Sequence, residues 1–190
     1  MTRLLNIIAA FICCVILAPF MGIIALLIKL TSKGTVIFKQ RRIGLGGKEF
    51  NMYKFRTMYT DTPDNVPTHL LDDPLRHITR FGGFLRKVSL DELPQLWNIL
   101  SGDMNFVGPR PALYNQYDLI ELREKYNIHS IRPGITGWAQ VNGRDELIIP
   151  LKVEYDKYYL ENRSLGLDLR IIALTVSRVL SGKGIIEGKQ

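Results

Sequence analysis

The stretch LLNIIAAFICCVILAPFMGIIALLI, residues 4–28, contains no charged residue, and Asn6 is its only clearly polar one. As a straight helix of about 25 residues it would be roughly 37 Å long, which exceeds the ~30 Å hydrocarbon core of a bilayer. A secretory signal peptide fits poorly, because the stretch is too long and no small-x-small cleavage site follows it. We therefore predict that residues 1–33 form a membrane-inserted helix.

The middle and the flanks of this segment complicate a simple membrane span. Pro19 removes a backbone hydrogen bond and costs ~3 kcal/mol inside a regular helix. Arg3 precedes the segment, and five lysines and arginines follow it between residues 29 and 42. The positive-inside rule would hold both ends in the cytoplasm. A re-entrant helix that bends at Ala18-Pro19 satisfies both observations, while charge alone leaves a kinked spanning helix equally open.

The charge of the chain indicates anionic partners. Its 190 residues carry a formal net charge of +7, which suits nucleic acid, phosphorylated substrates or acidic lipid. The sequence has no helix-turn-helix, RRM or zinc-finger signature, so we expect no nucleic-acid partner. The adjacent Cys13 and Cys14 provide neither a disulfide framework nor a metal-binding spacing.

We predict that residues 34–190 form one mainly helical domain of the α+β class, large enough to be a catalytic domain. Residues 35–58, TVIFKQRRIGLGGKEFNMYKFRTM, are two β-prone runs around a glycine-rich turn and predict a β-hairpin. Residues 80–100 look helical in two pieces, and residues 114–126 resemble another helix. A C-terminal amphipathic helix would either pack on the core or lie on the bilayer surface. Its predicted apolar face comprises Leu169, Ile172, Ala173, Val176, Val179 and Leu180.

SLDELPQLWN, residues 89–98, places two carboxylates, Asp91 and Glu92, just before a proline. The local pattern fits a capping box, with Ser89 as N-cap and Glu92 reaching back from the third helical position. Acidic side chains are also common in a first helical turn, because the helix dipole favours them there. The alternative is that the pair performs chemistry, and this stretch alone does not exclude either interpretation.

Several arginines occur in loops rich in glycine and proline rather than on helix faces. They are Arg110 in GPRP, Arg132 in IRPG and Arg144 in NGR. Proline restricts the backbone, and a planar guanidinium binds phosphate oxygens in pairs. These loops therefore predict a diphosphate site.

Three motifs together resemble the bacterial sugar transferases known as monotopic phosphoglycosyl transferases. The motifs are residues 89–113, SLDELPQLWNILSGDMNFVGPRPAL; residues 53–58, YKFRTM; and residues 132–144, RPGITGWAQVNGR. The resemblance covers essentially the whole chain. It implies transfer of a sugar-1-phosphate from a UDP-sugar to polyprenol (undecaprenyl) phosphate with release of UMP, the first membrane step of capsule, O-antigen, exopolysaccharide or glycoprotein glycan synthesis. It also implies a location on the cytoplasmic face of the bacterial inner membrane.

The resemblance further implies a re-entrant helix and interfacial helices around a small catalytic core. It assigns Asp91 and Glu92 to catalysis through a covalent phosphosugar on Asp91, with Mg²⁺ as the cofactor and Asp91 as its ligand. Many members carry serine before the helix-breaking proline, where this chain has Ala18, so the bend relies on Pro19 and on packing. The donor sugar and the oligomeric state stay open, a homo-oligomer included.

The implied chemistry requires positive charge around the carboxylates. A carboxylate that attacks an anionic diphosphate meets a like-charge cost of about 4 kcal/mol per pair at ~4 Å and an effective dielectric of ~20. Mg²⁺ and arginines would offset this cost, and the candidates are Arg56, Arg86, Arg110, Arg132 and Arg144. We expect the helix N-terminus to keep Asp91 ionised, and the adjacent charge to raise the pKa of Glu92 so that it can act as general base.

Two other function classes fit the same composition. An ordinary membrane glycosyltransferase would transfer sugar without phosphate and release UDP. A non-enzymatic membrane-anchored scaffold would bind anionic lipid without turnover.

Overall fold

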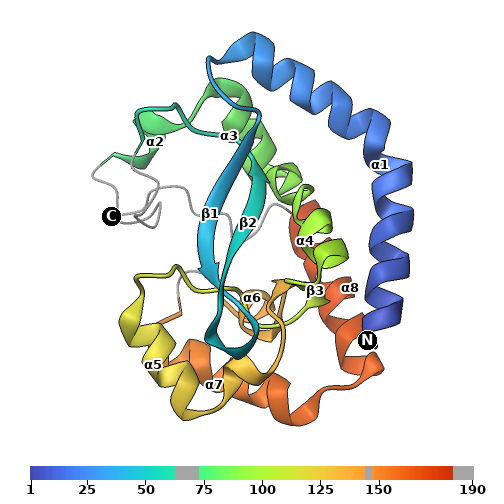
Figure 1. The fold of residues 1–190 in the computed structure, drawn as a ribbon, viewed down its shortest axis with the longest axis vertical. Helices are drawn as coiled ribbons and strands as arrows, with labels where there is room; N and C mark the ends of the chain where they lie inside the picture. The colour runs from blue at the N-terminus through green and yellow to red at the C-terminus, as the bar shows by residue number, and fades with distance from the viewer. Residues whose placement is uncertain (63–72, 144–146, 182–190) are drawn as a thin grey trace.

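The computed structural model describes residues 1–62, 73–143 and 147–181, and these form a mainly helical α+β fold (Figure 1). Two small sheets hold the strands: β1 pairs antiparallel with β2, which confirms the predicted hairpin, and β3 pairs parallel with β4. The elements are α1 (Arg3–Thr31), β1 (Ile37–Ile43), η1 (Leu45–Gly47), β2 (Glu49–Phe55), α2 (Pro74–His77), α3 (Arg80–Lys87), η3 (Leu90–Glu92), α4 (Gln95–Ser101), β3 (Asn105–Val107), α5 (Tyr117–Lys125), η4 (Ile128–Ser130), β4 (Gly134–Thr136), α6 (Trp138–Val141), α7 (Ile149–Asn162) and α8 (Leu165–Ser181).

The N-terminal end of α1 is tied to the domain by polar contacts. Asn6 is fully buried, and its side-chain oxygen accepts a hydrogen bond from the Phe106 backbone N–H at 2.8 Å. Its side-chain nitrogen donates to the Thr2 carbonyl at 2.9 Å. Arg3 donates to the Met104 carbonyl at 2.9 Å. The one clearly polar residue of the apolar stretch therefore docks the helix on β3.

The rest of α1 packs on the same domain through its small and apolar residues. Ala10 lies in a core cluster with Met52 of β2 and Ile99 of α4. Near the other end, Ile24 and Ile28 share a cluster with Phe55 and Leu85. Both ends of α1 therefore contact one globular unit. Figure 1 shows α1 along one side of this unit as a bent rather than straight helix, and Pro19 lies inside it.

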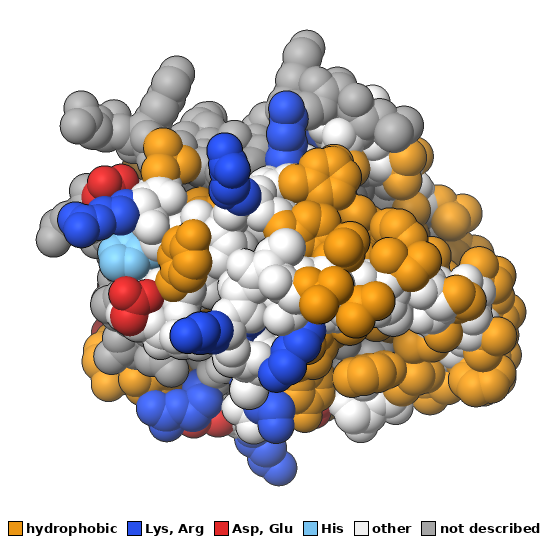
Figure 2. Space-filling view, turned by 90° about the horizontal axis from the view of Figure 1, so that it is seen from above, with side chains coloured by type: hydrophobic (Ala, Val, Ile, Leu, Met, Phe, Trp, Pro, Cys, Tyr) orange, Lys and Arg blue, Asp and Glu red, His pale blue; other side chains and the backbone are white. Residues whose placement is uncertain are grey.

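The opposite side of α1 is exposed and apolar. The helix is long and apolar enough to cross a membrane. Figure 2 shows hydrophobic side chains gathered on the side where α1 lies, with lysine and arginine side chains next to them. The exposed large residues of α1 are Leu4, Leu5, Ile8, Phe11, Ile12, Val15, Ile16, Phe20, Ile23, Leu26, Leu27 and Leu30. This surface would be costly in water and suits a lipid environment.

The hairpin is held against α4 by one buried amide. Asn98 accepts a hydrogen bond from the Tyr53 backbone N–H at 2.9 Å and donates to the Asn51 carbonyl at 2.7 Å. These two bonds satisfy backbone groups of β2 that face away from β1 in the antiparallel register. The inner face of β2 carries Met52, which is buried in the core beside α4.

The C-terminal helix α8 packs on the core through a face that coincides only in part with the predicted apolar one. Ile171 and Asp168 are buried, whereas Leu169, Ala173 and Val176 are exposed. Asp168 accepts a hydrogen bond from the Tyr159 hydroxyl at 2.7 Å. The core contact uses Asp168 and Ile171 together with Ile172 of the predicted apolar face, while Leu169, Ala173 and Val176 of that face lie on the surface.

Replacing Asn6 with Leu tests whether this amide docks α1. We expect Asn6→Leu to lower the free energy of unfolding by about 1–3 kcal/mol, because the buried Phe106 N–H loses its acceptor. Leucine keeps the apolar character of the helix, so insertion into detergent or lipid is retained. Thermal unfolding in detergent measures the change, with Ile12→Leu on the exposed face as the control. Equal stability of the two variants would contradict a docking role for Asn6.

Candidate active site

The backbone around the two carboxylates differs from the predicted capping box. Ser89 adopts a left-handed conformation with φ 57°, and its side chain makes no capping bond. Asp91 and Glu92 lie in the short helix η3, and α4 begins only at Gln95. The capping-box prediction is therefore wrong, because the left-handed Ser89 turns the chain at the end of α3 and the Glu92 carboxylate is bound elsewhere.

The Glu92 carboxylate is held by two cations from distant parts of the chain. Lys54 of β2 donates to its Oε1 at 2.8 Å, and both terminal nitrogens of Arg110 lie 3.3 Å from the same oxygen. All three side chains are at most about one-third exposed. Charge-assisted hydrogen bonds are strong in such sites, so this cluster joins β2, η3 and the loop after β3.

Asp91 is buried beside this cluster. Lys54 Nζ lies 3.9 Å from its Oδ2, which makes Lys54 a shared cation between the two carboxylates. Arg86, at the end of α3, also acts on Asp91, because its positive charge lowers the pKa of that carboxyl, as does that of Arg110. The site therefore places a buried carboxylate among three cations.

The two carboxyls have pKa shifts opposite to those expected from sequence. Burial raises the pKa of Asp91, with the charge of Glu92 adding to it, and the three cations oppose this only in part. Burial alone would raise the pKa of Glu92, but Lys54 and Arg110 outweigh it and hold this pKa well below its usual range. Both expectations were wrong because burial and long-range ion pairs outweigh the helix N-terminus and the adjacent charge.

Lys54 is a site residue that the sequence interpretation missed. It belongs to YKFRTM, and the signal was its place in the strand. Alternation puts Lys54 on the same face as Met52, which is buried. A lysine on the inward face of a strand needs an anionic partner, and the adjacent acids Asp91 and Glu92 were candidates for it.

The other predicted phosphate-binding arginines are placed differently. Arg56 is buried and donates to the Ser32 carbonyl at 2.9 Å, next to the end of α1. Arg132 donates to the Gly102 carbonyl at 2.7 Å, at the end of α4. In the described part of the chain neither contacts Asp91 or Glu92, so their phosphate-binding role stays a prediction. Arg144 lies outside the described residues.

A Mg²⁺ at this site would need most of its ligands from a substrate. The described residues contain no group of three or more His, Cys, Asp or Glu side chains that could hold a metal ion. Mg²⁺ commonly uses one or two carboxylates together with substrate phosphates. The Glu92 carboxylate is engaged by two cations, so the Asp91 carboxylate is the donor that suits such an ion.

Lys54→Met tests the charge arrangement through the pH dependence of stability. The low pKa of Glu92 in the folded state stabilises the protein above pH ~4.3, the unfolded value, and this contribution is lost as pH falls. We expect Lys54→Met to lower the free energy of unfolding by about 1–3 kcal/mol at pH 7 and by less near pH ~2, because Glu92 stays ionised in the folded protein well below pH ~4.3 and takes up its proton only in stronger acid. Protonation of Asp91 at low pH acts in the same direction. Thermal unfolding at both pH values measures the difference, and a loss independent of pH would contradict the pairing.

Comparison with known proteins indicates a bacterial sugar transferase over almost the entire chain. The family model for bacterial sugar transferases matches residues 1–182. The chain is 45% identical to an uncharacterized sugar transferase, EpsL, of Bacillus subtilis, over 96% of this chain and 89% of the relative. It is 46% identical to the UDP-glucose:undecaprenyl-phosphate glucose-1-phosphate transferase of Xanthomonas campestris pv. campestris, over 87% of this chain.

A third relative carries a different sugar in its name. The UDP-N-acetylgalactosamine-undecaprenyl-phosphate N-acetylgalactosaminephosphotransferase of Aeromonas hydrophila is 40% identical over 96% of this chain. The chain spans 36% of the Xanthomonas relative and 44% of the Aeromonas one. The chain belongs to the bacterial sugar transferase family, whose model covers residues 1–182 and so includes the carboxylate pair and its cations.

Proposed function

We propose that this enzyme transfers a sugar-1-phosphate from a UDP-sugar to undecaprenyl phosphate and releases UMP, through a covalent phosphosugar on Asp91. One observation carries the proposal: a buried carboxylate lies among Lys54, Arg86 and Arg110, on a domain that bears an exposed apolar helix. The names of the Xanthomonas and Aeromonas relatives support the donor and acceptor classes.

In the first step, an Asp91 carboxylate oxygen attacks the sugar-linked phosphorus of the donor. The new O–P bond forms as the bond from this phosphorus to the bridging oxygen breaks, and UMP leaves with the electron pair. The raised pKa of Asp91 suits this role, because a more basic carboxylate is a better nucleophile once it is ionised. Lys54, Arg86 and Arg110 offset the like-charge repulsion between carboxylate and diphosphate, about 4 kcal/mol for each pair at ~4 Å.

A divalent cation would complete this charge balance. Asp91 would hold a Mg²⁺, which would supply further positive charge where negative charge accumulates. Without the carboxylate of Asp91, the described residues around η3 leave only the paired Glu92 as an acidic ligand. We therefore propose Asp91 as the protein ligand of Mg²⁺.

In the second step, a phosphate oxygen of the polyprenyl acceptor attacks the same phosphorus and displaces the Asp91 carboxylate. The products are the polyprenyl diphosphate sugar and the regenerated enzyme. The low pKa of Glu92 makes it a weak proton acceptor in the ligand-free protein. We therefore assign Glu92 the task of holding Lys54 and Arg110 in place for the phosphates, in place of the general-base role expected from sequence.

The docking of α1 supports a re-entrant rather than a spanning helix. Arg3 and Asn6 at one end, and Ile24 and Ile28 at the other, contact the same globular unit. If one domain on one side of a bilayer binds both ends of a helix, those ends do not lie on opposite sides of that bilayer. Such an arrangement keeps Asp91 at headgroup level, where the acceptor phosphate lies while its polyprenyl tail stays in the hydrocarbon. We propose the cytoplasmic face of the inner membrane, in agreement with the exposed Lys29 and Lys33.

Nucleotide release tests the reaction. We expect the wild type, in detergent with Mg²⁺, undecaprenyl phosphate and a panel that includes UDP-glucose and UDP-N-acetylgalactosamine, to release UMP from one donor. Asp91→Asn removes the nucleophile, so release should fall by at least ~10³-fold, while Asp118→Asn on an exposed surface leaves it unchanged. Release of UDP would instead indicate an ordinary glycosyltransferase. UMP release retained by Asp91→Asn would contradict the covalent step, and no release from any donor would favour a scaffold.

Topology is tested by single-cysteine labelling in a background with Cys13 and Cys14 replaced by Ala. We expect cysteines introduced at Thr2 and Lys33 to react with a membrane-impermeant maleimide from the same side of oriented inner-membrane vesicles. Both positions flank α1, so their common accessibility follows from a re-entrant helix. Labelling from opposite sides would show a spanning helix.

A further inference from the structure

The loop that carries Arg110 is fixed through its carbonyl groups. Pro109 and Pro111 have no backbone N–H to donate. The Pro109 carbonyl accepts from the Gly134 N–H at 3.0 Å, and the Pro111 carbonyl accepts from Arg42 at 2.9 Å. Between them, the Arg110 carbonyl accepts from Arg123 Nη1 at 2.8 Å. Three successive carbonyls are therefore held by three different elements.

Arg123 reaches this carbonyl as one branch of a buried fork. Its Nε and Nη2 donate to Asp156 Oδ2 at 3.0 and 2.6 Å, while Nη1 donates to the loop. Both side chains of the pair are 2% exposed. A buried ion pair is weak evidence for stability, since an apolar pair of similar size is often as stable or more so. Its geometry nevertheless links α5 and α7 to the backbone of a residue in the candidate active site.

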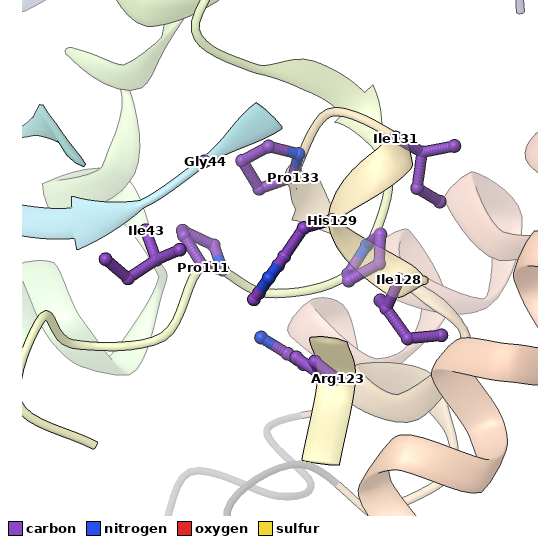
Figure 3. A pocket seen from close by; sticks show the side chains of 9 residues that line it. Ile43, Gly44, Pro111, Arg123, Ile128, His129, Ile131 and Pro133 are labelled. Carbon is purple, nitrogen blue, oxygen red and sulfur yellow. The ribbon is translucent and has the colours of Figure 1, made fainter. Parts of the chain in front are cut away.

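The loop also lines a small cavity. Its volume is about 10 Å³, room for about one water molecule, and its lining includes Pro109, Pro111, Arg123 and His129. Figure 3 shows the Arg123 and His129 side chains directed toward this cavity. Both ring nitrogens of His129 are buried without a hydrogen-bond partner, so His129 does not hold the loop. Among the described side chains, Arg123 is the one that donates a hydrogen bond to the Arg110 carbonyl.

We propose that the Arg123–Asp156 pair is a positioning unit that holds the Arg110 backbone, and thereby sets the Arg110 guanidinium against Glu92 and the substrate diphosphate. Asp156 fixes the orientation of the Arg123 fork, the fork fixes the Arg110 carbonyl, and the guanidinium of Arg110 extends from that fixed point to Glu92 at 3.3 Å. The proposal deepens the proposed function and rests on it for its kinetic consequence.

A double variant separates positioning from folding. Arg123→Met with Asp156→Leu removes both charges, so no unpaired buried charge remains and the fold is retained. Arg123→Lys is the second variant, since lysine keeps the ion pair but lacks the fork that also reaches the loop. Tyr159→Phe is the matched control, because it removes the buried hydrogen bonds of that hydroxyl to Asp168 and to the Val107 carbonyl, one turn further along α7, without contact to residues 109–111.

We expect the double variant to lower the kcat of UMP release by ~10- to 100-fold, which is typical when a residue that orients an active-site group is removed. Tyr159→Phe should change kcat by less than ~2-fold. If the pair acts through Arg110, the same double variant should lower kcat by less than ~2-fold further in an Arg110→Gln background. Unchanged kcat in the double variant, or an equal additive loss in the Arg110→Gln background, would overturn the proposal.

Hydrogen exchange gives a readout that does not depend on activity. Amides in peptides covering residues 108–113 should exchange faster in the double variant and in Arg123→Lys than in the wild type and Tyr159→Phe. Unchanged exchange would overturn the positioning role even in an active enzyme. If the wild type released no UMP, the proposed function would fail, while the exchange comparison would still decide whether the pair holds the loop.

Discussion

The Asn98 amide is the interaction on which the site geometry depends. It is fully buried and binds β2 through the Tyr53 N–H and the Asn51 carbonyl, while the backbone carbonyl of Asn98 accepts from the backbone N–H groups of Asp103 and Met104. Lys54 follows Tyr53 directly in β2. Because Asn98 belongs to the helix that follows η3, this single side chain sets the distance between the strand that supplies Lys54 and the segment that supplies Asp91 and Glu92.

The two neighbouring carboxylates then acquire different properties from their surroundings. Glu92 meets Lys54 and Arg110 directly, so its negative charge is stabilised. Asp91 is buried with only a longer contact to Lys54, so the same cations compensate its burial less completely. One carboxylate becomes a fixed anion that organises cations, and the other becomes the more basic group. Two adjacent carboxylates of the same chemistry therefore differ in pKa because their contacts differ.

Much of the fold could be predicted from sequence because its signals are local. Apolar length predicted α1, two β-prone runs around a glycine-rich turn predicted the hairpin, and the two helical pieces between residues 80 and 100 correspond to α3 and α4. The parallel pair β3–β4 escaped prediction because each strand has three residues. The S-x-x-E pattern at Ser89 predicted a cap that the left-handed backbone does not form.

Sequence motifs named most of the residues that the structure brings together around Asp91, but not the electrostatics of this cluster. Asp91, Glu92, Arg86 and Arg110 were candidates from motifs and loops, whereas Lys54 was missed. The partners of Glu92 lie 38 and 18 residues away in sequence, so no local pattern reports them. The pKa directions depend on burial and on those distant cations, and both come from tertiary structure.

The docking of α1 has a consequence for the order of events during synthesis. Arg3 and Asn6 bind groups about 100 residues further along the chain. At roughly 5–20 residues per second, ~5–20 s separate the appearance of the helix from that of its docking surface. Throughout this interval the buried polar contacts that join the helix to β3 and to the end of α4 cannot form. On the proposed membrane location, the bilayer would receive the helix before the domain exists, and the domain would then fold against a helix that is already in the membrane.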